Sequence, residues 1–153
     1  MDRRRFMEQG GLAGLVASLG ALGWLPAPAQ AQDWNRGAFE AKSLEEVLKA
    51  LGGGGAVRSD QIILTAPEIA EHGAVVPVTA GSKLPATEGL AILVEKNPNM
   101  LAALFQFPPG TLPEVNTRVK MAQTCNVFAL ARTGAGFAYT AREVKITLGG
   151  CGG

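Results

Sequence analysis

From Gln61 onward, the chain is a series of short apolar runs separated by turn residues. Runs of this length that are bounded by Gly, Pro and Asn are typical of paired strands. About seven strands are expected, at the spacing of an antiparallel β-sandwich. They cover residues 62–65, 75–79, 90–95, 101–107, 118–121, 127–132 and 137–148. The sequence therefore predicts an all-β fold.

The segments between these strands carry turn signals. Pro67–Glu71 is expected to be a connection, and Gly81–Pro85 a loop. Thr133–Gly136 is expected to close a hairpin. Pro77 has no N–H to offer a neighbouring strand, so it marks its own strand as an edge strand or as the site of a bulge.

Residues 32–58 are expected to form an N-terminal segment with one amphipathic helix, ahead of a sandwich domain that spans residues 59–148. Ser43 and Glu46 form a capping box at the start of the helix. The apolar face follows the i, i+3, i+4, i+7 spacing, with Leu44, Val47, Leu48 and Leu51. The run Gly52–Gly55 follows a helix instead of preceding one, so it is interpreted as a helix stop and linker and not as a phosphate-binding loop.

Residues 1–31 resemble a twin-arginine signal peptide. Arg3 and Arg4 are followed by Phe6 and Met7, and a glycine-rich apolar stretch comes next. That stretch is short for a membrane span, which needs roughly 20 apolar residues. Ala29-x-Ala31 is a small-residue cleavage signal, so we expect the mature chain to begin near Gln32 and to be exported to the periplasm without stable membrane association.

The composition excludes several classes of site. The formal net charge is +1, so no basic face for nucleic acid is expected. His72 is the one histidine and is expected to be a solvated residue of a turn. With one histidine and two well-separated cysteines, the sequence has no metal site of familiar spacing and no Ser-His-Asp set. The distinctive chemistry of the chain is therefore that of a thiol, and we expect no cofactor.

That thiol is Cys151, in the run Gly149, Gly150, Cys151, Gly152 and Gly153. Glycine has no preferred conformation, so residues 149–153 are expected to be a flexible arm. At ~3.3–3.6 Å per residue, the thiol reaches roughly 10 Å beyond the last strand. No helix N-terminus or cation is near it in the sequence to lower its pKa. Such a thiol suits a carrier whose reactivity comes from other enzymes better than it suits a catalytic nucleophile.

Other interpretations of the two cysteines remain open at this point. Cys125 and Cys151 are candidates for a disulfide in the oxidising periplasm, although a disulfide gives the glycines no purpose. Prenylation needs a cysteine one position earlier. The alternative function is a binding or structural sandwich whose Cys151 forms an intermolecular disulfide. Cys125 is either a small buried hydrophobe or, if exposed, a group that traps Cys151.

Taken together, these features resemble the SoxY family, the sulfur carriers of the periplasmic thiosulfate-oxidising Sox system. The resemblance covers essentially the whole chain, and the final pentapeptide is its most specific element. The shared elements are the twin-arginine start, Ile62-x-Leu64-x-Ala66-Pro67-x-Ile69-Ala70-Glu71-x-Gly73-Ala74-x-Val76-Pro77-Val78, Asn97-Pro98-Asn99, Lys120-Met121-Ala122-Gln123 and residues 149–153.

The resemblance implies an immunoglobulin-like sandwich that pairs tightly with a SoxZ-like β-sandwich subunit. It also implies that Cys151 is the covalent attachment site for sulfur. A c-type haem enzyme would join thiosulfate to the thiol, a hydrolase would release sulfate, and a sulfane dehydrogenase, where present, would oxidise the remaining sulfur. The chain itself would not be an enzyme.

Overall fold

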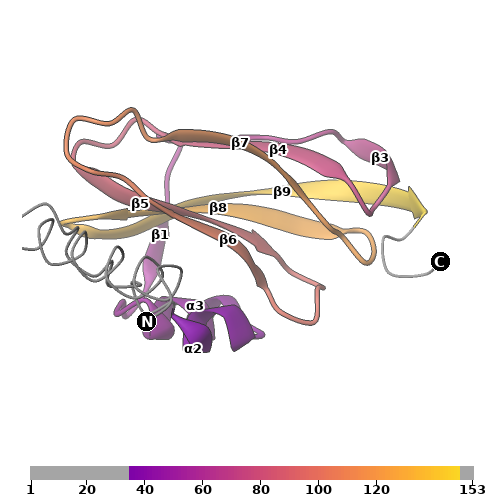
Figure 1. The fold of residues 1–153 in the computed structure, drawn as a ribbon, viewed down its shortest axis with the longest axis horizontal. Coiled ribbons are helices and arrows are strands. Elements are labelled where there is room, and N and C mark those ends of the chain that lie inside the picture. The colour runs from indigo at the N-terminus through magenta and orange to yellow at the C-terminus, as the bar shows by residue number, and fades with distance from the viewer. Residues whose placement is uncertain (1–34, 149–153) are drawn as a thin grey trace, which may run out of the picture. The chain divides into compact units, whose positions relative to one another are not determined.

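The computed structural model describes residues 35–148, which form two facing β-sheets with two short helices on the outer face of the larger sheet (Figure 1). The all-β sandwich expected from the sequence is confirmed. The described helices are α2 (Arg36–Glu40) and α3 (Leu44–Ala50). The described strands are β1 (Ala56–Arg58), β2 (Ile62–Thr65), β3 (Ile69–His72), β4 (Val76–Ser82), β5 (Thr87–Val94), β6 (Leu101–Gln106), β7 (Glu114–Val119), β8 (Cys125–Thr133) and β9 (Gly136–Leu148).

The larger sheet has the strand order β1-β9-β8-β5-β6, and the smaller sheet has the order β2-β4-β7. Most neighbouring strands are antiparallel, but β1 and β3 each pair with β9 in parallel. β1 pairs with the start of β9, where Ala56 lies opposite Phe137. β3 pairs with its end, where His72 lies opposite Leu148. The strand β9 is therefore long enough to pair with β1 near its start and with β3 near its end.

Both faces of the interior strand β5 are buried from Gly89 onward, which explains the uninterrupted apolar sequence of its residues 90–94. Leu90, Ile92 and Val94 point into the core between the two sheets. Ala91 and Leu93 point the other way, into a second core beneath the helices. This second core contains Val47 and Leu48 of α3, Leu101 of β6 and Leu130 of β8. The short helices are therefore held by burial of their apolar faces rather than by their own length.

The capping signals at both ends of α3 work as predicted. Ser43 Oγ accepts a hydrogen bond from the N–H of Glu46 at 3.2 Å. Glu46 Oε2 accepts one from the N–H of Lys42 at 2.8 Å. Gly52 follows the helix with φ +85°, which favours glycine. A side chain at Gly53 would collide with the ring of Phe137, so this position needs glycine for space.

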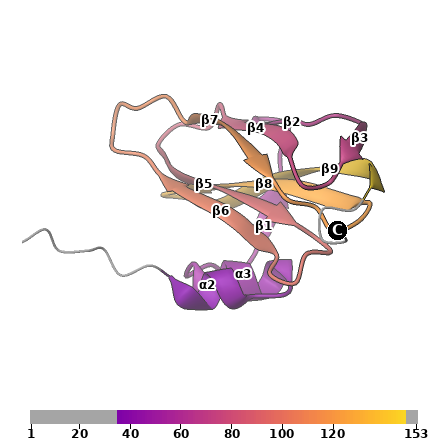
Figure 2. The same ribbon diagram turned by 45° about the vertical axis from the view of Figure 1, so that its right-hand side comes forward.

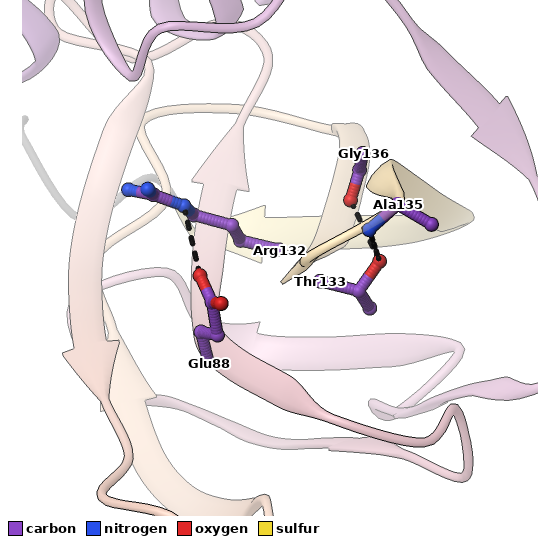
Figure 3. Close-up of polar contacts among 5 residues, drawn as sticks. All are labelled: Glu88, Arg132, Thr133, Ala135 and Gly136. Carbon is purple, nitrogen blue, oxygen red and sulfur yellow. Dashed lines mark hydrogen bonds and ion pairs between the residues drawn. The ribbon is translucent and has the colours of Figure 1, made fainter.

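The β8–β9 hairpin forms where the sequence placed it (Figure 3). Thr133 Oγ1 donates to the carbonyl of Gly136 at 3.0 Å and accepts from the N–H of Ala135 at 3.3 Å. Beside it, Arg132 Nε lies 3.4 Å from Glu88 Oε2, and both side chains are about half exposed. An exposed ion pair of this kind adds little stability. The turn is therefore supported by the hydroxyl of Thr133 and by the pairing of Thr133 with Gly136, with little contribution from the ion pair.

Four expectations about strands need correction. The strand expected at residues 118–121 begins earlier, at Glu114, and ends at Val119, as β7. The segment Pro67–Glu71 is not only a connection, because β3 begins at Ile69. Gly81–Pro85 is not entirely loop, because β4 continues through Ser82. Ala56–Arg58, expected as the end of the N-terminal segment and outside the sandwich, forms the edge strand β1 of the larger sheet.

Pro77 lies on a central strand and not on an edge strand, because β4 is the middle strand of the smaller sheet. The pairing of β2 with β4 stops at Thr65 opposite Thr79, however. At Pro77 the strand has a neighbour on one side only, namely β7, where Pro77 lies opposite Arg118. The missing N–H of Pro77 thus coincides with a missing neighbour on one side, although β4 as a whole is not an edge strand.

Among residues 35–148, no helix is long and apolar enough to cross a membrane.

Candidate functional site at the end of the last strand

The residues that the sequence singles out lie largely outside the described part of the chain. These are Cys151, the arm glycines Gly149, Gly150, Gly152 and Gly153, and the signal residues Arg3 and Arg4. The structure does describe β9, the strand that leads directly to residue 149. The candidate site is therefore built from the residues that surround the last four positions of β9, which we call the arm root (residues 145–148).

The arm root extends beyond the first residue of β8. The pairing of β8 with β9 begins at Cys125 opposite Val144, so residues 145–148 have no partner on β8 itself. Strand β3 supplies a partner instead, with Ile69 opposite Lys145 and His72 opposite Leu148. Figure 2 shows β3 beside the end of β9, at the opposite end of the sheet from the β8–β9 hairpin. Without β3, the strand would protrude unpaired.

Hydrogen bonds hold the arm root on both of its edges. The N–H of Lys145 donates to the carbonyl of Glu68 at 2.9 Å, on the side of β3. The N–H of Ile146 points to the other side and donates to Thr124 Oγ1 at 2.9 Å. Since successive N–H groups of a strand face opposite edges, these two bonds fix the strand from both directions.

A third bond secures the arm root one residue before its end. Thr147 Oγ1 donates to the carbonyl of Glu71 at 3.0 Å, again on the side of β3. Together with the pairing of His72 and Leu148, it extends the ordered backbone to the last residue before the glycines.

The loops at this end of the sandwich are tied to one another through Asn97. Its Nδ2 donates to the carbonyl of Lys120 at 2.7 Å, and its Oδ1 accepts from the N–H of Ala122 at 3.1 Å. The N–H of Met121 donates to the carbonyl of Gly73 at 2.7 Å. The amide of Asn97 thus joins the β5–β6 and β7–β8 loops, and Met121 joins the latter to the β3–β4 turn. Hydrogen bonds therefore connect the three loops at the end of the sandwich where the arm root lies.

His72 is exposed, as expected, but it lies at the end of β3 and not in a turn. Its pairing with Leu148 places it next to the arm root. Within residues 35–148, no cluster of three His, Cys, Asp or Glu side chains has a geometry suited to a metal ion.

Cys125 is a buried residue of the core between the sheets, with 4% of its surface exposed. Burial raises the pKa of its thiol, and the nearby charge of Glu95 acts in the same direction, while hydrogen bonding with the backbone of Lys96 opposes them. A protonated, buried thiol is a poor nucleophile. The structure therefore supports the interpretation of Cys125 as a small buried hydrophobe and not as an exposed thiol.

Sequence reasoning did not identify Thr124, Thr147 or the strand β3 as supports of the arm root. In β3 only Ala70 is buried and the other three residues are exposed, so the sequence of this strand has little apolar alternation to indicate it. The two threonine hydroxyls bond to backbone groups that are distant in the sequence. No local pattern indicates such partners.

Comparison with known proteins gives one family match. The family described as "Sulfur oxidation protein SoxY" matches residues 48–151. The solved structure of the sulfur carrier protein SoxY from Chlorobium limicola f thiosulfatophilum aligns with a TM-score of 0.58 at 35% identity. That alignment covers 65% of this chain and 93% of the other.

A superoxide reductase (neelaredoxin) from Ignicoccus hospitalis aligns with a TM-score of 0.49 at 16% identity, over 60% of this chain and 94% of the other. No curated protein sequence matches.

Proposed function

Because the chain belongs to the SoxY family of sulfur oxidation proteins and is a sulfur carrier, we propose that Cys151 is the residue that bears the sulfur. The observation that carries this proposal is the arm root. β9 is held by Thr124 on one edge at Ile146 and by β3 on the other edge as far as Leu148, and Cys151 follows only three residues later. A thiol so close to a rigid strand, with only glycines beside it, can enter a narrow active site while the sandwich stays outside.

The first step is an oxidative conjugation by a c-type haem enzyme. The thiolate of Cys151 and the sulfane sulfur of thiosulfate form a new S–S bond: Cys–S⁻ + ⁻S–SO₃⁻ → Cys–S–S–SO₃⁻ + 2e⁻. The two electrons pass to the haem enzyme and on to its acceptor. The carrier supplies a nucleophile and no redox centre of its own, so its cargo is covalently bound sulfur rather than a cofactor.

The following steps release sulfate in stages. A hydrolase uses one water to give Cys–S–S–SO₃⁻ + H₂O → Cys–S–SH + HSO₄⁻. Where a sulfane dehydrogenase is present, it oxidises the persulfide: Cys–S–S⁻ + 3H₂O → Cys–S–SO₃⁻ + 6H⁺ + 6e⁻. A second hydrolysis, Cys–S–SO₃⁻ + H₂O → Cys–SH + HSO₄⁻, restores the thiol. The carrier catalyses none of these steps.

The burial of Cys125 supports Cys151 as the reacting thiol, because the raised pKa of Cys125 and its lack of exposure both oppose attack on sulfur. The test is the intact mass of the mature chain after incubation with thiosulfate and the Sox enzymes. We expect sulfur and thiosulfonate adducts that are absent from Cys151→Ser and retained in Cys125→Ser. Adducts that persist in Cys151→Ser and vanish in Cys125→Ser would reverse the assignment. A reducible dimer without any adduct would favour the alternative disulfide function.

We also propose that the chain works in the periplasm. The support is the pair Arg3 and Arg4 with the cleavage signal Ala29-x-Ala31. The mass of the exported protein measures this directly, and a mature N-terminus near Gln32 is the expected result. Replacing Arg3 and Arg4 by lysine should leave uncleaved protein in the cytoplasm, whereas unchanged export would contradict the twin-arginine assignment.

A SoxZ-like subunit is the proposed stable partner, on the strength of family membership. Co-expression of the two chains should give a heterodimer that remains intact on gel filtration. The mature chain alone should be less soluble than the pair. A stable, fully soluble monomer would argue against an obligate partner.

A further inference from the structure

We infer that the end of the sandwich around the arm root is the docking surface for the enzymes that modify Cys151, and that Ile69 and Val75 are its apolar contacts. This inference rests on the proposed function, because it takes Cys151 as the thiol that those enzymes reach. It concerns a different question, namely which part of the folded body touches them.

The length of the arm limits how far away an enzyme can be. The backbone is fixed as far as Leu148 by strand pairing and by the bond from Thr147 Oγ1 to Glu71. At ~3.3–3.6 Å per residue, the three steps to Cys151 span roughly 10 Å. An enzyme whose reacting group lies at the bottom of a channel must therefore bring the rim of that channel against the end of the sandwich.

That end carries two of the four large hydrophobic side chains that are exposed within residues 35–148. Ile69 is 60% exposed and lies opposite Lys145 of the arm root. Val75 is 56% exposed and lies in the β3–β4 turn, where its N–H donates to the carbonyl of His72 at 3.4 Å. Since His72 lies opposite Leu148, Ile69 and Val75 belong to the segment that runs beside the arm root on the side of β3.

Polar side chains border these two residues. Glu71, His72, Lys120 and Lys145 are all exposed at the same end. A small apolar centre with a polar border is the usual anatomy of a protein contact surface. The fitting partner surface is a modest apolar rim around a channel mouth, with polar groups outside it.

The size of the patch favours a passing enzyme over a permanent subunit. A stable interface buries about 1,200–2,000 Å² in total, around several large anchors. Two aliphatic side chains on an otherwise polar end provide much less. A carrier that visits several enzymes in turn has to leave each of them, so a weak contact of this size suits the proposed function.

The fold offers a matched control at the far end of the same strand. Val57 is 73% exposed and lies opposite Ala138, near the start of β9. It has the same chemistry as Val75, and its strand β1 pairs with β9 as the β3 strand of Ile69 does. Replacing it tests the effect of removing an exposed aliphatic group well away from the arm root.

The experiment uses the mature chain in complex with its partner subunit, the purified thiosulfate-conjugating haem enzyme, thiosulfate and an electron acceptor. The variants are Ile69→Thr with Val75→Thr, and Val57→Thr as the control; threonine keeps the β-branched shape. We expect kcat/KM for the carrier to fall roughly tenfold in the double variant, mainly through KM, as the loss of two partly exposed aliphatic contacts predicts. Val57→Thr should stay within about twofold.

Two controls show whether a fall in kcat/KM comes from weaker docking or from a change in the reactivity of the Cys151 thiol. Alkylation of Cys151 by iodoacetamide should proceed at the same rate in all variants, because its chemistry is unchanged. Binding of the haem enzyme to chains that also carry Cys151→Ser should weaken in the double variant alone, which tests docking independently of any reaction. If no adduct forms on the unmodified chain, the proposed function fails, while this binding measurement still decides the docking inference.

Equal kcat/KM and equal binding in the double variant and Val57→Thr would overturn the inference. Loss of the partner subunit from the double variant would also overturn it, because Ile69 and Val75 would then belong to the permanent interface. Concentration-dependent dimers that disappear in the double variant would instead assign the patch to contact between copies of this chain.

Discussion

Burial lowers the reactivity of Cys125, one of the two cysteines of this chain. Cys125 is in the core with a pKa raised by desolvation, whereas Cys151 follows the last strand among glycines. Two accessible thiols in one chain would risk closing a disulfide in an oxidising compartment. Burying Cys125 between the sheets removes that risk without removing the residue.

Cys125 should make stability depend on pH above the ordinary thiol pKa of about 8.5. The folded chain retains the thiol proton at a pH where the unfolded chain has lost it, so the free energy of unfolding falls as the pH rises through this window. Below the window, both states are protonated and the contribution is constant. Urea unfolding from pH 7 to 10 in a Cys151→Ser background should show this slope.

The matched control for that slope is Cys125→Ala in the same background. It loses some stability at every pH because it leaves a small cavity. Its pH slope should nevertheless be shallower than that of the Cys125 chain. Identical slopes would mean that the thiol of Cys125 is not perturbed in the folded state.

Asn97 is a second residue whose contribution to the free energy of unfolding can be measured. Its amide makes two hydrogen bonds to the backbone of the β7–β8 loop. Asn97→Ala should lower the free energy of unfolding by about 1–2 kcal/mol, because two backbone groups lose their partner. Asn99→Ala, at an exposed position of the same turn, should cost far less. Chemical denaturation of both variants measures the difference.

At the scale of elements, the accuracy of sequence reasoning follows the range of the interactions. The capping of α3 by Ser43 and the hairpin at Thr133–Gly136 depend on neighbours within a few residues, and both were predicted. The short strands β1 and β3 depend on parallel pairing with β9, far along the chain. Their sequences contain no alternation long enough to indicate a strand, so both were missed.

The outcome for Pro77 also depended on residues that are distant in the sequence. The missing N–H correctly predicted that one neighbour would be absent. Whether this makes the whole strand an edge depends on where β2 ends, and β2 pairs with residues 79–82 of β4 only. The register of a distant strand decided the outcome. The arm root could not be anticipated for this reason, since its supports come from β3 and from Thr124.

The arm root should respond selectively to the loss of one hydroxyl. Thr124→Val removes the acceptor for the N–H of Ile146 while keeping the shape of the side chain. Amide hydrogen exchange at Ile146 should then accelerate by roughly tenfold or more, since that N–H loses its partner. Thr124→Ser keeps the hydroxyl and should retain most of the protection. Equal exchange in both variants would show that the hydroxyl does not protect this amide.

At the scale of the whole molecule, the folded body and the thiol-bearing residues are expected to be separable. The two cores and all described strand pairings lie within residues 35–148. A chain that ends at Leu148 should therefore unfold within about 0.5 kcal/mol of the longer chain. It should form no thiosulfate adduct. Guanidinium unfolding and intact mass measure the two properties, and a large loss of stability would mean that residues 149–153 pack on the body.

The position of β9 in the larger sheet has a consequence for biosynthesis. It follows all the other described strands in the chain, yet β8, β1 and β3 all pair with it. While the ribosome is still making the earlier strands, β1 and β3 have no partner, so the larger sheet cannot be completed during most of translation. Synthesis that stops before β9 is therefore expected to leave fragments whose larger sheet is incomplete and which proteases can degrade.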